Sequence, residues 1–294
     1  MKILEIPDLL TPGRTKVMGI VNVTPDSFSD GGAWFDPEKA VSHALELEAE
    51  GADILDIGGE STRPGAKSLS PAQEQERVLP VIHGYLKASR RPLPISLDTV
   101  NAETAQAGIA AGVQIINDIS GGIMDPQMLA VVAENDAYYI CQHMRGNPKT
   151  MDSLCDYGGD VIGGVCEGLK KRVQACEKVG VNLQRLILDP GLGFAKSAQQ
   201  SWELLGNLDK LAKLGYPLLI GASRKRFLEM AVPAAWDNHL PAGVQAGTGR
   251  REAATTAVSA LCGQAGVWAV RVHKVAASLS AVVAGQLWRE VKCR

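Results

Sequence analysis

Eight short apolar segments alternate with eight helical segments along this sequence, and that alternation predicts a (β/α)8 barrel, also called a TIM barrel. Parallel strands need such crossover helices, because a tight turn cannot return the chain to the same end of a sheet. An open doubly wound sheet usually begins with a GxGxxG turn, which is missing here. No linker or break in composition divides the 294 residues, so we expect one domain over residues 1–294, with its core at 16–292.

The predicted strands of the first half are runs of Val, Ile and Leu, which are typical of strands buried on both faces. With the loops that follow them, they cover 17–23, 52–59, 94–99 and 113–122. Asp36-Pro37 and Ser70-Pro71 are helix-start signals, and Gly51 and Gly112 are helix-stop signals. The helices expected between these strands cover 36–51, 70–87, 101–112 and 125–134.

The second half repeats the pattern. Its predicted strands, again with their loops, cover 137–148, 185–197, 216–227 and 266–275. Its helices are expected at 157–179, 199–214, 250–265 and 276–292.

Composition narrows the class of protein. A hydrophobic content of 46% with 21% charged residues indicates a globular chain, and a net charge of −2 gives no reason to expect nucleic acid or an anionic membrane as a partner. No apolar run reaches the ~18 residues of a membrane span, and the start of the chain lacks a signal-peptide core. Six cysteines without a CxxC pair favour free thiols. We therefore expect a cytoplasmic enzyme.

Polar residues follow every predicted strand, and in a barrel these positions meet at one mouth, where such proteins hold their sites. Taken alone, each could cap the next helix; Asp98, followed by Thr99 and Asn101, is an example. Eight separate caps explain the whole set poorly, so we expect a site for a polar ligand. The residues are Asn22, Glu60, Ser61, Thr62, Arg63, Asp98, Asn117, Asp118, His143, Asp189, Ser223, Arg224, Lys225, Arg271 and His273.

The residue types indicate what such a ligand contains. Acid and amide groups at Asp98, Asn117 and Asp189 suit a flat heterocycle with amino and amide edges, to which Lys225 can donate. A second set is cationic and suits a phosphate or diphosphate: Arg63, Arg271 and His273. On sequence alone, His273 is also compatible with a core histidine. Arg271 lies between Val270 and Val272, which argues against a surface position.

The loop after the first strand is longer than the ~2–6 residues usual for such connections. It carries hard oxygen donors that could serve a divalent cation, namely Asn22, Asp26 and Asp30. Three further loop residues could line an apolar slot for an aromatic substrate or simply pack the loops: Phe28, Pro64 and Phe194.

Eight motifs, in order and at matching spacing, resemble those of the dihydropteroate synthase family: NVTPDSFSDGG, DIGGESTRPGA, SLDT, INDISGG, HMRGNPKTM, LDPGLGF, GASRKRF and RVH. The resemblance extends from the first to the last strand. It implies a pterin-binding (β/α)8 barrel, a transferase of folate biosynthesis that joins 7,8-dihydropterin-6-ylmethyl diphosphate to 4-aminobenzoate and releases diphosphate. It also implies Mg²⁺, a homodimer formed through the last helices, and inhibition by sulfonamides, which mimic aminobenzoate.

The resemblance also implies residue roles. The pterin would be bound by Asp98, Asn117, Asp189 and Lys225, with Thr62, Met144 and Ser223 nearby. The diphosphate would be held by Asn22, Arg63, Arg271 and His273, and Asp30 would help Asn22 to place Mg²⁺. The aminobenzoate would be framed by Phe28, Pro64, Phe194 and Ser223. The expected catalytic set is Asp98, Asp189, Lys225, Arg271 and His273.

Diphosphate leaves readily once its charge is neutralised, and an aryl amine needs no general base, so we expect an SN1-like substitution. Two alternatives are a methyltetrahydrofolate methyltransferase-type domain, which would lack the first two motifs, and an inactive pterin-binding subunit, which would have lost its anion ligands. Three features depart from the family pattern: Lys274 where Asp is common, Gln142 where an apolar residue is expected, and the segment 232–251, which we cannot align.

Overall fold

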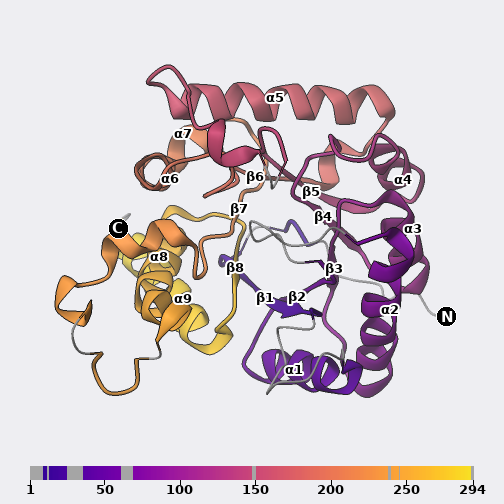
Figure 1. The fold of residues 1–294 in the computed structure, drawn as a ribbon, viewed down its shortest axis with the longest axis horizontal. Helices are drawn as coiled ribbons and strands as arrows, with labels where there is room; N and C mark the ends of the chain where they lie inside the picture. Colours follow the sequence, from indigo (N-terminus) through magenta and orange to yellow (C-terminus); the bar gives the residue numbers. More distant parts are fainter. Residues whose placement is uncertain are drawn as a thin grey trace.

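A computed structural model describes residues 9–11, 13–24, 36–60, 69–147, 150–237, 240–244 and 246–292. Its eight strands form one parallel sheet in the order β6-β5-β4-β3-β2-β1-β8-β7, and helices surround it (Figure 1). The two ends of the sheet meet where Leu188 of β6 forms an isolated parallel bridge with Leu218. The predicted (β/α)8 barrel is therefore confirmed, with its closure reduced to that single bridge.

The strands fall within or next to the segments predicted from the sequence, and several of them end on a polar residue of the predicted site, such as Asn22, Asp98 or Asp189. Their bounds are β1 Lys16–Asn22, β2 Ile54–Gly58, β3 Ile95–Asp98, β4 Ile115–Asp118, β5 Tyr138–Gln142, β6 Leu186–Asp189, β7 Leu219–Ile220 and β8 Ala269–Val272.

The helices alternate with these strands as predicted. Their bounds are α1 Pro37–Ala49, α2 Pro71–Ala88, α3 Ala102–Ala111, α4 Met128–Glu134, α5 Val161–Val179, α6 Ala198–Leu205, α7 Leu208–Ala212, α8 Glu252–Ala265 and α9 Val275–Lys292. Short 3₁₀ turns cover Met151–Ser153, Leu183–Arg185, Arg226–Ala231, Ala234–Asp237 and Gly247–Arg251.

Capping explains where the helices begin. The Asp36 side chain accepts hydrogen bonds from the first turn of α1, and Ser70 forms a capping box at α2. Asp160 caps α5, which therefore starts later than the predicted residue 157. The predicted helix at 199–214 is two helices, since α6 ends at its C-cap Gly206 before α7 begins.

The barrel interior is apolar at the amino ends of the strands and polar at the carboxyl ends. Side chains of Met18, Ile54 and Leu219 belong to a buried cluster at the amino ends of the strands, which we call the closed end of the barrel. There the Trp268 indole donates to the Leu9 carbonyl at 2.9 Å. Side chains on a strand alternate faces, so the residue of β2 that next points inward after Ile54 is Asp56, which is fully buried. The polar end is thus built into the strands themselves.

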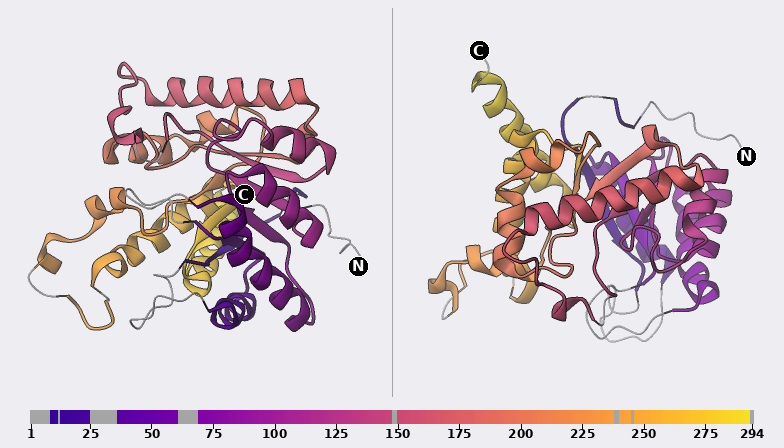
Figure 2. Two further views of the ribbon diagram at one scale, coloured as in Figure 1. Left: turned by 45° about the vertical axis from the view of Figure 1, so that its right-hand side comes forward. Right: turned by 90° about the horizontal axis from the view of Figure 1, so that it is seen from above.

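Helices α8 and α9 lie together at one side of the barrel (Figures 1 and 2). Two glycines permit their close approach. A Cβ at Gly285 would collide with the Ala260 carbonyl oxygen, and a Cβ at Gly263 with the Val282 carbonyl oxygen. Because the colliding atoms are backbone, the clash cannot be relieved by a side-chain rotation.

We expect Gly285→Ala to lower the free energy of unfolding by about 1–3 kcal/mol, the usual cost of overpacking. Gly206→Ala is the matched control: its φ is −71°, and its nearest neighbour would be the Trp202 carbonyl at 3.5 Å. Urea denaturation measures both variants. Equal midpoints would show that α8 and α9 separate without cost.

No helix within the described ranges is long and apolar enough to span a membrane. The five described cysteines, Cys141, Cys155, Cys166, Cys176 and Cys262, are free thiols, as predicted.

Candidate active site

A half-buried arginine joins two carboxylates at the carboxyl end of the barrel. Arg271 of β8 donates from Nε to Asp56 Oδ2 at 2.5 Å and from Nη2 to Asp98 Oδ2 at 2.7 Å. The Asn117 amide of β4 donates to both Asp56 oxygens at 3.3 Å. Two predicted site residues, Arg271 and Asn117, therefore contact Asp56, and Asp98 joins this cluster through Arg271. Asp98 is not a helix cap, since its carboxylate is directed into the barrel toward Arg271.

Sequence reasoning missed Asp56. The signal was available, because Asp56 is an acid inside the apolar run Ile54-Leu55-Asp56-Ile57, as Arg271 is a cation inside an apolar strand. Its side chain is fully buried, whereas that of Arg271 is 22% exposed. A buried ion is retained only when it is paired, so Asp56 and Arg271 depend on each other.

Burial controls the charge state of this cluster. It raises the pKa of Asp98 to about 7, although the Arg271 guanidinium opposes that rise. Burial alone would lower the pKa of Arg271, but Asp56 and Asp98 together raise it above the ordinary value. Arg271 is thus a permanent cation, while Asp98 gains or loses its proton near neutral pH.

A second charged pair, Lys225 and Asp189, lies beside the cluster of Asp56, Asp98, Asn117 and Arg271. The Lys225 ammonium donates to the Leu192 carbonyl at 2.7 Å and lies 4.7 Å from the centre of the Phe194 ring. The Asp189 carboxylate accepts from the Gly191 amide at 2.6 Å. A Cβ on Gly221 would lie 3.6 Å from Asp189 Oδ2 and 3.7 Å from Lys225 Nζ, so the two charges face the same point.

The two charges affect each other. Burial lowers the pKa of Lys225 to about 8, and Asp189 opposes that shift. Burial also raises the pKa of Asp189, against the effect of Lys225. The pair provides an acceptor and a donor side by side for a polar ring edge.

An apolar wall adjoins these groups. Phe194 and Met144, both predicted site residues, belong to one buried cluster with Ile119, Met151 and Ala195. The wall follows β4, β5 and β6, so it lies on the side of the mouth that carries Asp189. It offers a flat ring a surface for packing next to the hydrogen-bonding groups.

A buried lysine behind the wall was also missed. Lys196 is 6% exposed; its ammonium donates to the Phe194 carbonyl at 2.8 Å and lies 3.0 Å from His143 Nδ1. Burial lowers the pKa of Lys196 to about 7, and burial with the nearby Lys196 lowers the pKa of His143 to about 2. His143 therefore stays neutral and can accept from the lysine. Lys196 stands between Ala195 and Ser197 in a loop, and this pattern carries no sequence signal for such burial.

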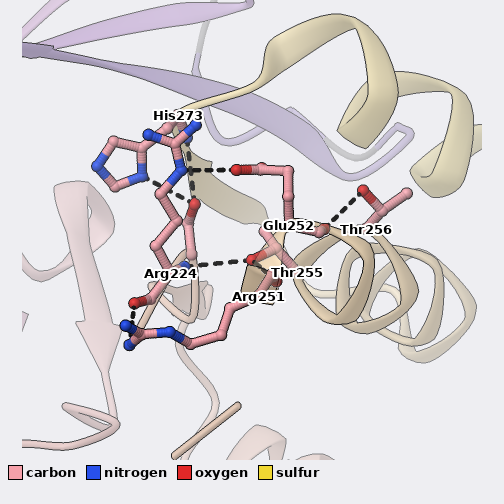
Figure 3. Close-up of polar contacts among 7 residues, drawn as sticks. Arg224, Arg251, Glu252, Thr255, Thr256 and His273 are labelled. Carbon is pink, nitrogen blue, oxygen red and sulfur yellow. Dashed lines mark hydrogen bonds and ion pairs between the residues drawn. The ribbon is translucent and has the colours of Figure 1, made fainter. Parts of the chain in front are cut away.

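His273 is not a core histidine. Its Nδ1 lies 2.9 Å from Ser223 Oγ, and its backbone N–H donates to the same oxygen at 3.3 Å (Figure 3). Ser223 is buried, whereas His273 is half-buried. Since the Ser223 oxygen already accepts from the His273 backbone, its own hydrogen can be donated to Nδ1. The other ring nitrogen then carries the N–H group.

The structure describes some of the remaining predicted residues, and the others lie outside the described ranges. Asn22 ends β1 in register with Gly58, and Gly58 is in register with Asp98, so Asn22 lies at the same mouth. Lys274 is exposed, while Gln142 is buried and donates to the Ile119 carbonyl at 3.3 Å. Phe28, Asp30, Thr62, Arg63 and Pro64 lie outside the described residues.

Comparison with known proteins identifies relatives over nearly the whole chain. The family model described as "Pterin binding enzyme" matches residues 18–273. The dihydropteroate synthase of a Synechocystis species is 44% identical over 277 residues, which is 94% of this chain and 91% of that protein. The Mycobacterium leprae dihydropteroate synthase is 41% identical over 273 residues, which is 93% of each chain.

Solved structures of dihydropteroate synthases are also similar to this chain over nearly its whole length. Xanthomonas albilineans dihydropteroate synthase with 4-aminobenzoic acid has a TM-score of 0.81 at 40% identity, covering 96% of this chain and 94% of that one. The same enzyme in complex with 7,8-dihydropteroate has a TM-score of 0.79 at 37% identity, covering 97% and 96%. The Yersinia pestis enzyme, in a sulfonamide drug complex, has a TM-score of 0.85 at 32% identity, covering 99% of each chain.

Proposed function

Since the chain belongs to the dihydropteroate synthase family, we propose that it joins 7,8-dihydropterin-6-ylmethyl diphosphate to 4-aminobenzoate and releases diphosphate. The family resemblance of the sequence motifs is confirmed, and so is the expectation of a transferase family. The observation that carries the proposal is the cluster of Asp56, Asp98, Asn117 and Arg271 at the carboxyl end of the barrel.

The pterin would take its hydrogen bonds from two groups of residues. Asp98 and Asn117 present acceptors and a donor on one side, and Asp189 and Lys225 do so on the other. Carboxylates suit the amino and ring N–H groups of a pterin, and a lysine ammonium suits its carbonyl or ring nitrogen. The apolar wall that contains Phe194 would pack against the rings.

Arg271 and His273 would hold the diphosphate. Arg271 remains charged at any working pH, and the ring nitrogen of His273 opposite Ser223 carries a donor. Arg271 lies in β8 and His273 directly follows that strand, so both would approach the leaving group from one side. Stabilising the developing charge of that group is the main contribution that such residues can make.

Mg²⁺ is part of the proposal, with Asn22 and Asp30 as its expected protein ligands. No group of three or more His, Cys, Asp or Glu side chains in the described ranges could hold a metal ion. Mg²⁺ commonly uses one or two protein groups together with substrate phosphates. The Asn22 amide oxygen at the strand end is a suitable hard donor. When bound, the ion would neutralise diphosphate charge.

The substitution would be dissociative. As diphosphate leaves, Asp98 and Asp189 would stabilise the cationic methylene attached to the pterin, and the aminobenzoate nitrogen would then form the new C–N bond. A methyltransferase-type domain fits the pterin residues equally well but has no use for Arg271 and His273 beside a strand-end asparagine. An inactive subunit is disfavoured because these two expected anion ligands, Arg271 and His273, are retained.

Aminobenzoate and sulfonamides would share one slot against Phe194 and Ser223. A homodimer through the last helices is supported by exposed apolar side chains on α8 and α9: Leu261, Val283, Leu287, Trp288 and Val291. Sedimentation should then give twice the monomer mass of 31.2 kDa. A cytoplasmic location remains a prediction.

The activity should depend on pH in both directions. Protonation of Asp98, whose pKa burial raises to about 7, removes a pterin acceptor on the acid side. Deprotonation of Lys225, whose pKa burial lowers to about 8, removes a donor on the basic side. We therefore expect a narrow bell-shaped profile of kcat/KM, with limbs near those two values. A flat profile through the neutral range would contradict these assignments.

The proposed reaction is tested by diphosphate release from purified protein with Mg²⁺. Release should require the pterin diphosphate and be accelerated many-fold by 4-aminobenzoate, with dihydropteroate as the second product. Methyl transfer from a methylated folate, without diphosphate chemistry, would establish the methyltransferase alternative instead.

A further inference from the structure

Arg224 separates two predicted site residues and has an unfavourable backbone conformation. Its φ is +58°, in the left-handed region that residues with a Cβ rarely adopt. The side chains on either side diverge from this turn: Ser223 contacts His273, and Lys225 donates to the Leu192 carbonyl. Such strain persists only where the surroundings hold it.

The start of α8 holds Arg224 through three bonds (Figure 3). The Arg224 amide donates to Thr255 Oγ1 at 3.2 Å, and its carbonyl accepts from Arg251 Nη1 at 2.8 Å. Its Nε donates to Glu252 Oε2 at 2.6 Å. The Thr255 hydroxyl also donates to the Arg251 carbonyl at 3.0 Å, which ties the holding residues to one another. We call Arg224, Arg251, Glu252 and Thr255 the α8 latch.

We propose that Arg224 is a positioning residue: the α8 latch keeps its left-handed turn and thereby aims Ser223 at His273 and Lys225 at the pterin side of the site. This inference rests on the proposed function for its kinetic readout but not for its structural one. The segment 232–251, which could not be aligned, follows Arg224 and ends at the latch residue Arg251, so that segment would meet the site through the same contacts.

An ordinary stabilising ion pair is the competing explanation. Arg14 and Asp53 form such a pair at the closed end of the barrel, with an N–O distance of 2.7 Å and side chains 34% and 25% exposed. Arg224 and Glu252 are 25% and 23% exposed at 2.6 Å. The two pairs are thus well matched in burial and length. They differ in that only Arg224 combines a left-handed backbone with neighbours that belong to the predicted site.

The first experiment compares Arg224→Gly with Arg224→Gln. Glycine adopts a positive φ without strain and keeps both backbone hydrogen bonds, whereas glutamine keeps the strain and loses the ion pair. If the turn is what matters, Arg224→Gln should lower kcat/KM at least tenfold and Arg224→Gly by less than threefold. An equal loss in both would assign the role to the side chain itself, and no loss in either would remove the role; both results overturn the proposal.

The second experiment tests the holding residue. Thr255→Val removes the oxygen that accepts from the Arg224 amide, and Thr255→Ser retains it. Thr255→Val should lower kcat/KM and move the basic limb of the pH profile upward, because Lys225 would leave its buried position. Thr255→Ser should restore both. A loss of stability without a shift of that limb would overturn the proposal.

Arg14→Gln is the control for loss of a matched ion pair, and it should leave kcat/KM and the pH profile unchanged. Amide hydrogen exchange of the peptide spanning residues 221–227 provides a readout that needs no activity. Exchange should be faster in Arg224→Gln and Thr255→Val than in the wild type and in Arg14→Gln. If the wild type released no diphosphate, the proposed function would fail while this measurement still tested the latch. Unchanged exchange would overturn the latch itself.

Discussion

Replacing Asp98 by Asn is expected to reduce kcat/KM on the order of 10³-fold, because a site built to hydrogen-bond a polar ring loses strongly when one partner is wrong. The amide keeps the size of the carboxylate but presents a donor where the pterin also donates. It also removes the charge that would stabilise the cationic methylene. Steady-state kinetics with each substrate varied in turn measures the loss.

The fold should survive this change. Arg271 keeps its bond of 2.5 Å to Asp56, so no buried charge is left without a partner. Asp53→Asn is the matched control, since Asp53 pairs with an arginine at the opposite end of the barrel. It should lower stability modestly and leave kcat/KM within a factor of about two. Near-normal activity in Asp98→Asn, with both proteins folded, would refute the pterin assignment.

Replacing Arg271 by Met is expected to abolish turnover and to lower the free energy of unfolding by about 3–5 kcal/mol, the range for breaking one side of a buried ion pair. Two carboxylates, Asp56 and Asp98, would then lie together without their cation. Urea denaturation measures the change. The double variant with Asp56→Asn should regain part of the stability but none of the activity.

The stability loss should depend on pH with a definite sign. The folded-state pKa of Asp98 lies above its ordinary value of 3.8, and it would rise further without Arg271. Between pH 3.8 and the raised pKa of the folded state, the folded protein therefore binds more protons than the unfolded protein. Within that range, the free energy of unfolding falls as the pH rises. The deficit of Arg271→Met should be larger at pH 8 than at pH 5.5. A deficit that is the same at both values would show that the loss is one of packing alone.

The fold was accessible from the sequence because its signals are local. Apolar runs, helix-start residues such as Asp36 and Ser70, and glycine stops define the units, and their number defines the barrel. The two helix predictions that were wrong also have local causes. Gly206 divides a segment that periodicity alone reads as one helix, and Asp160 delays the start of α5.

The site was predicted where polar residues end or follow strands, whereas Asp56 in the middle of β2 and Lys196 behind the apolar wall were missed. Arg271 was recognised as a charge inside an apolar strand, yet the same pattern at Asp56 was passed over. Lys196 and the α8 latch depend on tertiary contacts between distant segments, such as the ion pair of Arg224 with Glu252. No sequence pattern reports a contact of that kind.

One measurement tests the central claim most directly: the stoichiometry of the two products in a single reaction with pterin diphosphate, isotopically labelled 4-aminobenzoate and Mg²⁺. We expect one labelled dihydropteroate for each diphosphate released in the wild type, and neither product above background in Asp98→Asn. Diphosphate release without incorporation of the label, or incorporation that persists in Asp98→Asn, would contradict the account.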